Sequence, residues 1–349
     1  MNSVFSATLE KQMLAERARL PLRFPAVFVV LGMATLATMN AVRSSNWFNR
    51  PDRDDSFLTV QGHSRLSRLA FSPDGQFIAT AGTDYTVRVW EAHSGRELRV
   101  LRGHSDHRVL AVAFSPDGSW LASGSRDSTV RVWDPTAGRE IKTLRGHRDR
   151  VMTLAISPDG SLIATGSRDH SVKIWDARTF RERKSLGGVG EGFGFVRSIA
   201  FHPGIPLVAF GDWFGFVRLW NHQTSEVRVL GHFSRTIFDV AFSPDGHLLA
   251  SAGLDHRVRL FDVATVSQQQ VFEGHTAAVM AVAFSPGGHL LASGSDDRTI
   301  RLWNLDERRA ERTLVGHAKV VTSIAFSPDG SYLASTSADE TYKFWKIRP

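Results

Sequence analysis

Short alternations of apolar and polar positions recur from residue 56 to the end of the chain. In one unit, apolar residues occupy every second position at Val109, Ala111 and Ala113, and again at Val130 and Val132. Pro-Asp-Gly and Ser-Arg-Asp sequences, both typical of turns, separate these stretches. Residues two apart face the same side of a strand. The pattern therefore predicts units of three or four short antiparallel strands.

The unit repeats with a period near 42 residues. The tryptophan position of the unit is occupied by Trp90, Trp133, Trp175, Trp220, Phe261, Trp303 and Trp345. Successive positions lie 43, 42, 45, 41, 42 and 42 residues apart. A Gly-His pair recurs at Gly62-His63, Gly103-His104, Gly146-His147, Gly231-His232, Gly274-His275 and Gly316-His317. An FSPDG-like turn lies between pair and tryptophan, as at 114–118. Such a period indicates a closed or stacked repeat architecture.

These motifs resemble the WD40 repeat family over residues 57–347, in seven units. The resemblance implies an all-β, seven-bladed β-propeller, with one four-stranded sheet per blade. The seventh unit ends after its third strand, at 342–347, whereas the segment 57–60 precedes the first Gly-His pair as an outer strand would. We expect this N-terminal strand to complete the last blade, which leaves no open sheet edge. The propeller is predicted to span 56–349.

Repeated polar residues accompany each well-preserved unit. A single His, Ser and Asp would match the composition of a serine-hydrolase triad, but a catalytic site is one pocket and this set recurs. The resemblance implies instead a buried hydrogen-bonded chain from tryptophan through hydroxyl and imidazole to carboxylate. The residues assigned to these structural chains are His104, Ser123, Asp127, Trp133, His147, Thr165, Asp169, Trp175, His275, Ser293, Asp297, Trp303, His317, Ser335, Asp339 and Trp345.

The fourth unit departs from the pattern. It lacks the Gly-His pair, and Phe210 and Phe214 replace the hydroxyl residue and the turn aspartate. A glycine-rich loop, 187–194, enters this unit. A phosphate-binding loop would need a helix N-terminus after it, and a strand follows instead. We therefore expect a rim loop, or one end of a partner site.

Propellers that resemble this one bind partners mainly on the narrow top face, beside the inner strand and before the turn aspartate. The matching positions divide into an arginine group and an apolar group. The arginine group is Arg65, Arg108, Arg126, Arg150, Arg168 and Arg197. The apolar group is Phe195, Trp213, Phe238, Leu254 and Met280. Arginines beside aromatic residues are common in binding hot spots, although the arginines could simply solvate the rim and the aromatic residues could fill gaps in the fourth blade.

The region before the repeats contains a membrane-like segment. Residues 24–42 carry no charge for 19 positions, and a helix of that length spans about 28 Å. Arginines flank the segment, and Trp47 and Phe48 lie beyond it as interfacial residues would. We expect a transmembrane helix at 24–42, preceded by a tail at 1–23 and followed by a linker at 43–55. A cleaved signal peptide and a buried apolar segment remain alternatives.

Composition and charge narrow the chemistry further. The absence of cysteine excludes disulfides, thiolate nucleophiles, zinc fingers and iron–sulfur clusters, and we expect no metal and no cofactor. Residues 1–53 carry seven Lys or Arg against three Asp or Glu, which leaves +3 of the total +7 on the remainder. Because the region after residue 53 is close to neutral, nucleic acid is disfavoured as a general partner.

The resulting functional hypothesis is a non-enzymatic, protein-binding scaffold, monomeric and tethered to a membrane. Its top face would take an acidic and apolar protein segment. Two alternatives stay open: RNA or anionic lipid bound through the arginine group, and a propeller enzyme with a site in its central channel. Four Lys or Arg precede the predicted span and three come closely after it, a slight bias that places the propeller outside the cytoplasm.

The predicted span can be tested by itself. Residues 1–55 fused to a soluble reporter should fractionate with membranes and resist carbonate extraction, because 19 uncharged residues are long enough to cross the hydrocarbon core. Fractionation and reporter size are the measurements. A shortened, soluble reporter would indicate a cleaved signal instead.

Overall fold

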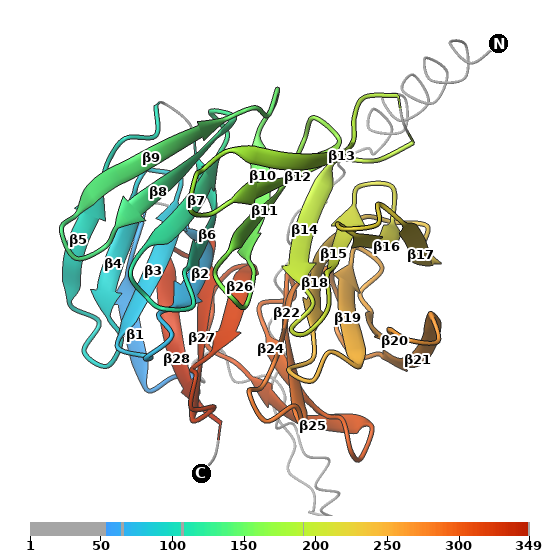
Figure 1. Ribbon diagram of the computed structural model, residues 1–349. Helices are drawn as coiled ribbons and strands as arrows, with labels where there is room; N and C mark the ends of the chain where they lie inside the picture. Colours follow the sequence, from blue (N-terminus) through green and yellow to red (C-terminus); the bar gives the residue numbers. More distant parts are fainter. Residues whose placement is uncertain (1–53, 64–65, 106–107, 191, 348–349) are drawn as a thin grey trace, which may run out of the picture. The chain divides into compact units, whose positions relative to one another are not determined.

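Alternating strands and turns fold into seven four-stranded antiparallel sheets arranged as a ring (Figure 1). The computed structural model describes residues 54–347 apart from 64, 65, 106, 107 and 191. The predicted seven-bladed propeller is confirmed. No helix in these described ranges is long and apolar enough to cross a membrane, and the predicted span 24–42 lies outside them, with the tail 1–23 and residues 43–53 of the linker.

The blades run in the order of the sequence units. Blade 1 contains β2 (Leu66–Phe71), β3 (Phe77–Gly82), β4 (Val87–Glu91) and β5 (Glu97–Leu101). Blade 2 contains β6 (Val109–Phe114), β7 (Leu121–Ser125), β8 (Thr129–Asp134) and β9 (Arg139–Arg145). Blade 3 contains β10 (Val151–Ile156), β11 (Leu162–Ser167), β12 (Ser171–Asp176) and β13 (Glu182–Gly187). Blade 4 contains β14 (Val196–Phe201), β15 (Leu207–Asp212), β16 (Phe216–Asn221) and β17 (Val227–His232).

The second half of the ring has the same order. Blade 5 contains β18 (Ile237–Phe242), β19 (Leu248–Gly253), β20 (Val258–Asp262) and β21 (Ser267–Phe272). Blade 6 contains β22 (Val279–Phe284), β23 (Leu290–Ser295), β24 (Ile300–Asn304) and β25 (Arg309–Leu314). Blade 7 contains β26 (Val321–Phe326), β27 (Tyr332–Ser337), β28 (Thr341–Lys346) and β1 (Leu58–Gln61).

The ring closes through β1, as the sequence predicts. This strand pairs antiparallel with β28, from Leu58 opposite Phe344 to Gln61 opposite Thr341 (Figure 1). The residues just before β1 add to the closure, since the Lys343 ammonium donates to the Asp54 carboxylate at 2.5 Å, and the Asp55 amide donates to the Val315 carbonyl. The last sheet therefore depends on the first strand of the propeller.

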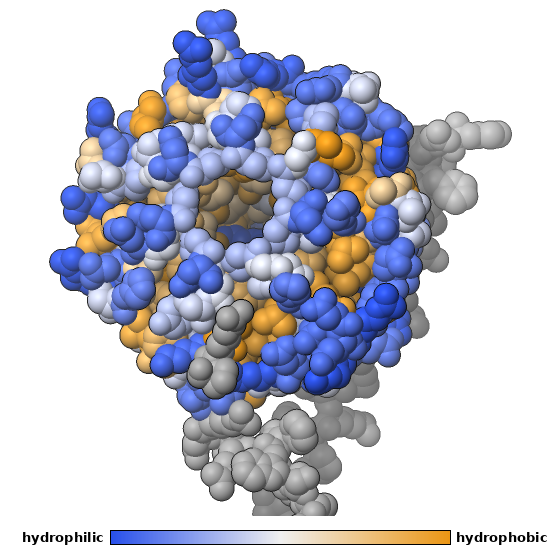
Figure 2. Space-filling view, turned by 60° about the horizontal axis from the view of Figure 1, so that its bottom comes forward, coloured by the Kyte–Doolittle hydropathy of each residue, from blue (hydrophilic) through white to orange (hydrophobic). Residues whose placement is uncertain are grey.

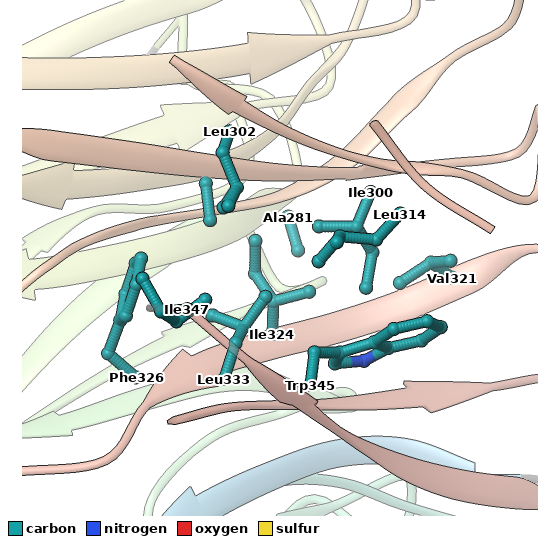
Figure 3. Packing of buried hydrophobic residues seen from close by; sticks show 11 residues of the cluster. Ala281, Ile300, Leu302, Leu314, Val321, Ile324, Phe326, Leu333, Trp345 and Ile347 are labelled. Carbon is teal, nitrogen blue, oxygen red and sulfur yellow. The ribbon is translucent and has the colours of Figure 1, made fainter. Parts of the chain in front are cut away.

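Apolar side chains join neighbouring blades. Seven buried clusters occur among the described residues, one between each pair of adjacent blades. Figure 3 shows the cluster between blades 6 and 7, where Ile300 of β24 and Leu314 of β25 lie next to the Trp345 ring of β28. Because side chains rather than a continuous backbone ladder hold these interfaces, their stability scales with the apolar area that they bury.

We call the face with the turns between the first and second strands of each blade the bottom face, and the opposite one the top face. Figure 2 views the ring from below and shows a central opening with a hydrophilic to neutral rim. On this face, a proline of one turn contacts a glycine of the next turn at most blade boundaries. Pro328 lies 3.3 Å from where a Cβ on Gly75 would sit, and the φ of +71° at Gly75 also favours glycine.

The closure predicts that the propeller cannot lose β1. A chain starting at Gln61 should aggregate and unfold at lower denaturant concentration, because β28 is then an open edge. A chain starting at Asp54 keeps the strand and the Lys343 contact and serves as the control. Size-exclusion chromatography and urea unfolding are the measurements. Equal solubility and stability of the two chains would refute this closure.

Candidate top-face interface

Five blades contain the expected polar chain. In blade 2 the Trp133 indole N–H donates to Ser123 Oγ at 2.8 Å, Ser123 Oγ is 2.8 Å from His104 Nε2, and His104 Nδ1 is 2.9 Å from the Asp127 carboxylate. Blades 3, 6 and 7 join their assigned residues in the same way. Blade 1 adds a fifth chain, through His63, Thr80, Asp84 and Trp90.

The two ends of each chain fix its direction. An indole N–H only donates and a carboxylate only accepts, so the neutral imidazole accepts at Nε2 and donates from Nδ1. Burial would raise the pKa of Asp127, but hydrogen bonds from His104 and Thr129 outweigh burial and hold that pKa below its usual value. The serine, imidazole and carboxylate are therefore all engaged within the blade.

The same aspartate ties together the turns of the top face. The Asp127 carboxylate accepts from the amides of Ser105 and Thr129, and the Arg126 amide donates to the Arg108 carbonyl at 3.0 Å. In blade 3 the Arg168 amide likewise donates to the Arg150 carbonyl at 2.9 Å. The backbones of these four arginines are thus joined in pairs by hydrogen bonds next to the polar chains.

Blade 4 replaces the polar chain with a buried ion pair, which the sequence reasoning did not identify. Arg218 donates to the fully buried Asp212 carboxylate, and its guanidinium lies 4.0 Å from the Phe216 ring centroid and 4.9 Å from that of Phe193. Arg218 also donates to the Gly192 carbonyl, and the Gly194 amide donates to Asp212. The glycine-rich loop is therefore anchored at its second half. The Trp220 indole N–H has no partner within the described part of the chain.

In blade 5 the Gly231-His232 pair does not begin a polar chain. Instead of entering a polar chain, the His232 ring stacks on Phe216 of blade 4, with centroids 4.0 Å apart. Phe233 lies over the Arg259 guanidinium at 4.0 Å, and Arg259 pairs with Asp255. Phe261 has no indole N–H to donate, and Ser251 Oγ is without a partner among the described residues. In blades 4 and 5 alike, the sequence feature that could have indicated the exception is a Phe, Phe193 or Phe233, near the position of the chain imidazole in the other blades.

Every inner strand carries a register shift at its second residue. Such a bulge leaves one residue out of the ladder and redirects its side chain. The bulged residues that line the top mouth of the central channel are Leu110, Met152, Arg197, Phe238, Met280 and Thr322. Family positions indicated Arg197, Phe238 and Met280, but the bulge that presents them has no sequence pattern of its own.

The structure gathers four of the six predicted arginines in blades 2 and 3. Burial, then repulsion from Arg150, Arg108 and Arg168, lowers the pKa of Arg126. Asp149 is the nearby carboxylate, 3.8 Å from Arg168. The group therefore carries a net positive charge. Arg65 lies outside the described residues.

The apolar group is not separate from the arginines. The Arg168 guanidinium lies 5.0 Å from the Phe195 ring centroid. The ring centroids of Phe195 and Trp213 are 5.9 Å apart. Trp213 is 40% exposed. Arg197 lies over Phe238 at 5.1 Å, whereas Leu254 is half-buried farther along blade 5. Arg168, Phe195 and Trp213 thus form one continuous cationic and aromatic surface, which we call the Arg168–Trp213 strip.

The polar chains generate a stability prediction. Asp127→Ala should lower the free energy of unfolding by about 1–3 kcal/mol, because the His104 N–H and two backbone amides lose their acceptor. Asp297→Ala in blade 6 should give a matching loss. Since folding lowers the pKa of Asp127, its contribution exists above pH 3.8 and declines as the pH falls through the folded value.

Urea unfolding of wild-type and variant chains at several pH values measures this. The difference between them should shrink below pH 3.8. A variant with full stability that lost a measurable catalytic activity would contradict the structural role.

Comparison with known proteins agrees with the geometry. The model of the family described as "WD domain, G-beta repeat" matches residues 55–91, 95–134, 138–176, 224–262, 266–304 and 308–346. The unmatched stretch between 176 and 224 contains blade 4 up to β16, where the polar chain is replaced.

The individual relatives match over short stretches. An uncharacterized WD repeat-containing protein of Nostoc is 60% identical over 37 residues, which is 11% of this chain and 3% of that protein. The WD repeat-containing protein RUP2 of Arabidopsis thaliana is 37% identical over 54 residues, 16% of this chain and 15% of the relative. The human F-box-like/WD repeat-containing protein TBL1Y is 28% identical over 85 residues, 24% of this chain and 16% of the relative. With six matched repeats in a seven-bladed ring, the chain belongs to the WD40 repeat family.

Proposed function

We propose that this propeller is a protein-interaction scaffold whose top face binds an acidic and apolar segment of a partner protein. The observation that carries the proposal is the Arg168–Trp213 strip, which continues into the arginines of blades 2 and 3. Arginine pairs with carboxylates through two parallel hydrogen bonds. An exposed tryptophan beside it offers the apolar contact that hot spots use.

The scaffold is proposed to work without catalysis of its own. Ser123, His104 and Asp127 have the residue types of a hydrolase triad, but each is buried and hydrogen-bonded within its blade. The same arrangement recurs in five blades. A repeated, fully engaged set of groups fits a structural role better than a single reactive site.

We also propose that residues 24–42 tether the propeller to a membrane, with the propeller on the extracytoplasmic side. The support is the uncharged length of this segment and the slight excess of Lys and Arg before it. The tether would confine the top face to partners at the same membrane.

A second candidate is binding of RNA or anionic lipid by the arginine group. Burial and then repulsion from the neighbouring arginines lower the pKa of Arg126, and the same repulsion favours any anion that enters the group, phosphate included. Salt separates the two candidates, because binding dominated by phosphates weakens steeply with ionic strength. An aromatic contact at Trp213 is much less sensitive to salt.

The top-face proposal predicts that Trp213→Ala weakens partner binding about tenfold or more, since truncating a central aromatic contact commonly costs over 1 kcal/mol. Arg126→Glu should weaken binding too, chiefly by slowing association, and more at low salt. The partner is the protein recovered with the wild-type chain. The measurements are the dissociation constant and the association rate of this partner with the wild type and with each variant.

Arg312→Glu provides the matched control. Arg312 lies on β25, the outer strand of blade 6, and donates to the Lys346 carbonyl rather than facing the top. Its charge reversal should change neither constant. Binding that survives both top-face changes and is lost with Arg312→Glu would place the partner on the circumference.

A further inference from the structure

The top mouth of the central channel is a cavity of about 230 Å³. Six bulged inner-strand residues line it, and five of them are uncharged. Arg197 is the charged member of these six, and Arg68 and Arg108 also line the cavity. The cavity is smaller than the pockets that hold drug-sized ligands. It therefore matches one inserted side chain rather than a folded segment.

The positive charge of Arg197 is not balanced inside the ring. Among the residues that the structure describes, no carboxylate lies within ion-pair distance of its guanidinium, which rests on the Phe238 ring instead. Burial, then repulsion from Arg68, lowers the pKa of Arg197 to about 10, so the group remains charged at neutral pH. An anion that entered here would remove an electrostatic cost of the empty site.

Asp239, an acidic residue of the inner strand β18, is already engaged. Asp239 of β18 accepts both terminal N–H groups of Arg68 across the channel at 3.3 Å. It also accepts from Ser198 Oγ at 2.7 Å and from the Val282 amide at 3.1 Å. These contacts hold Asp239 in the wall and leave it to neutralise Arg68. Arg197 is left facing the cavity with one uncompensated charge.

We infer that the channel mouth is a carboxylate-binding site that receives one glutamate or aspartate side chain of the partner, with the carboxylate on Arg197 and the methylene groups against Met152, Phe238 and Met280. This site deepens the proposed function and rests on it, because it names the residue that would anchor the acidic segment. The lining also includes Arg68, which Asp239 neutralises, and Arg108. A glutamate or aspartate side chain is favoured over a phosphate because its methylene groups can occupy the uncharged part of the lining.

Ligand-observed saturation-transfer NMR on the full chain tests the site. The probe is N-acetyl-glutamate N-methylamide, and its neutral isostere is the glutamine counterpart. The charged probe should bind with a dissociation constant of about 1–10 mM, a range expected for a ligand of this size. The glutamine counterpart should bind at least tenfold more weakly. Equal binding of the two would overturn the inference.

Variants assign the binding to Arg197. Arg197→Met places at this bulge the residue already present at Met152 and Met280, so the fold should persist, which near-ultraviolet circular dichroism checks. It should weaken the glutamate probe at least tenfold, and Arg197→Lys should weaken it a few-fold, since lysine keeps the charge but loses the bidentate geometry. Arg312→Met is the control and should bind as the wild type does. Unchanged binding in Arg197→Met would overturn the site.

Two further outcomes separate the possibilities. Inorganic phosphate that displaced the glutamate probe at a tenfold lower concentration than acetate does would overturn the choice of a carboxylate.

Trp213→Ala should leave probe binding unchanged. Partner binding that ignored Trp213→Ala while the probe still required Arg197 would refute the extended top-face interface and retain the channel site. Probe binding without any dependence on Arg197 would refute the channel site alone.

Discussion

A hydrogen-bonded chain from a buried tryptophan to a turn aspartate stabilises five of the seven blades. A buried indole N–H and a buried imidazole would each destabilise the fold if they lacked partners. Joining them through one hydroxyl satisfies both, and the aspartate at the end fastens the turns of the top face. The conformation of the surface around Arg108 and Arg126 thus depends on a network inside the blade.

Blades 4 and 5 compensate for the absence of the imidazole in the same way. A Phe ring takes its place beside an arginine, and Asp212 or Asp255 neutralises that arginine. The substitution is incomplete, because the Trp220 indole N–H and Ser251 Oγ are left without partners in the described structure. Blade 4 also carries the exposed Trp213. In blade 4, the interior that departs from the repeat pattern therefore lies beneath a surface that departs from it too.

The repeats made most of the architecture predictable. Period, turn chemistry and the resemblance indicated seven blades, the closing strand 57–60 and the residues of the polar chains, because each of these rests on a local pattern that recurs. The Arg218–Asp212 pair was missed because arginine or lysine occupies the equivalent position in every blade, so the residue type carried no distinguishing signal. The Arg68–Asp239 pair joins residues 171 positions apart, and only the closed ring brings them together. No periodicity reports such a contact.

At each inner-strand bulge of blades 2 to 7, one residue packs between blades and the next residue faces the channel mouth. The residue before each bulge must pack between blades, and it is Val109, Val151, Val196, Ile237, Val279 or Val321 in blades 2 to 7. The bulged residue beside it ranges from Leu110 to Arg197 to Thr322, since it takes no place in the ladder. Mutation can therefore alter the channel mouth one position at a time while the packing between blades stays unchanged. A ring built this way can acquire new recognition through single substitutions, without passing through unstable intermediates.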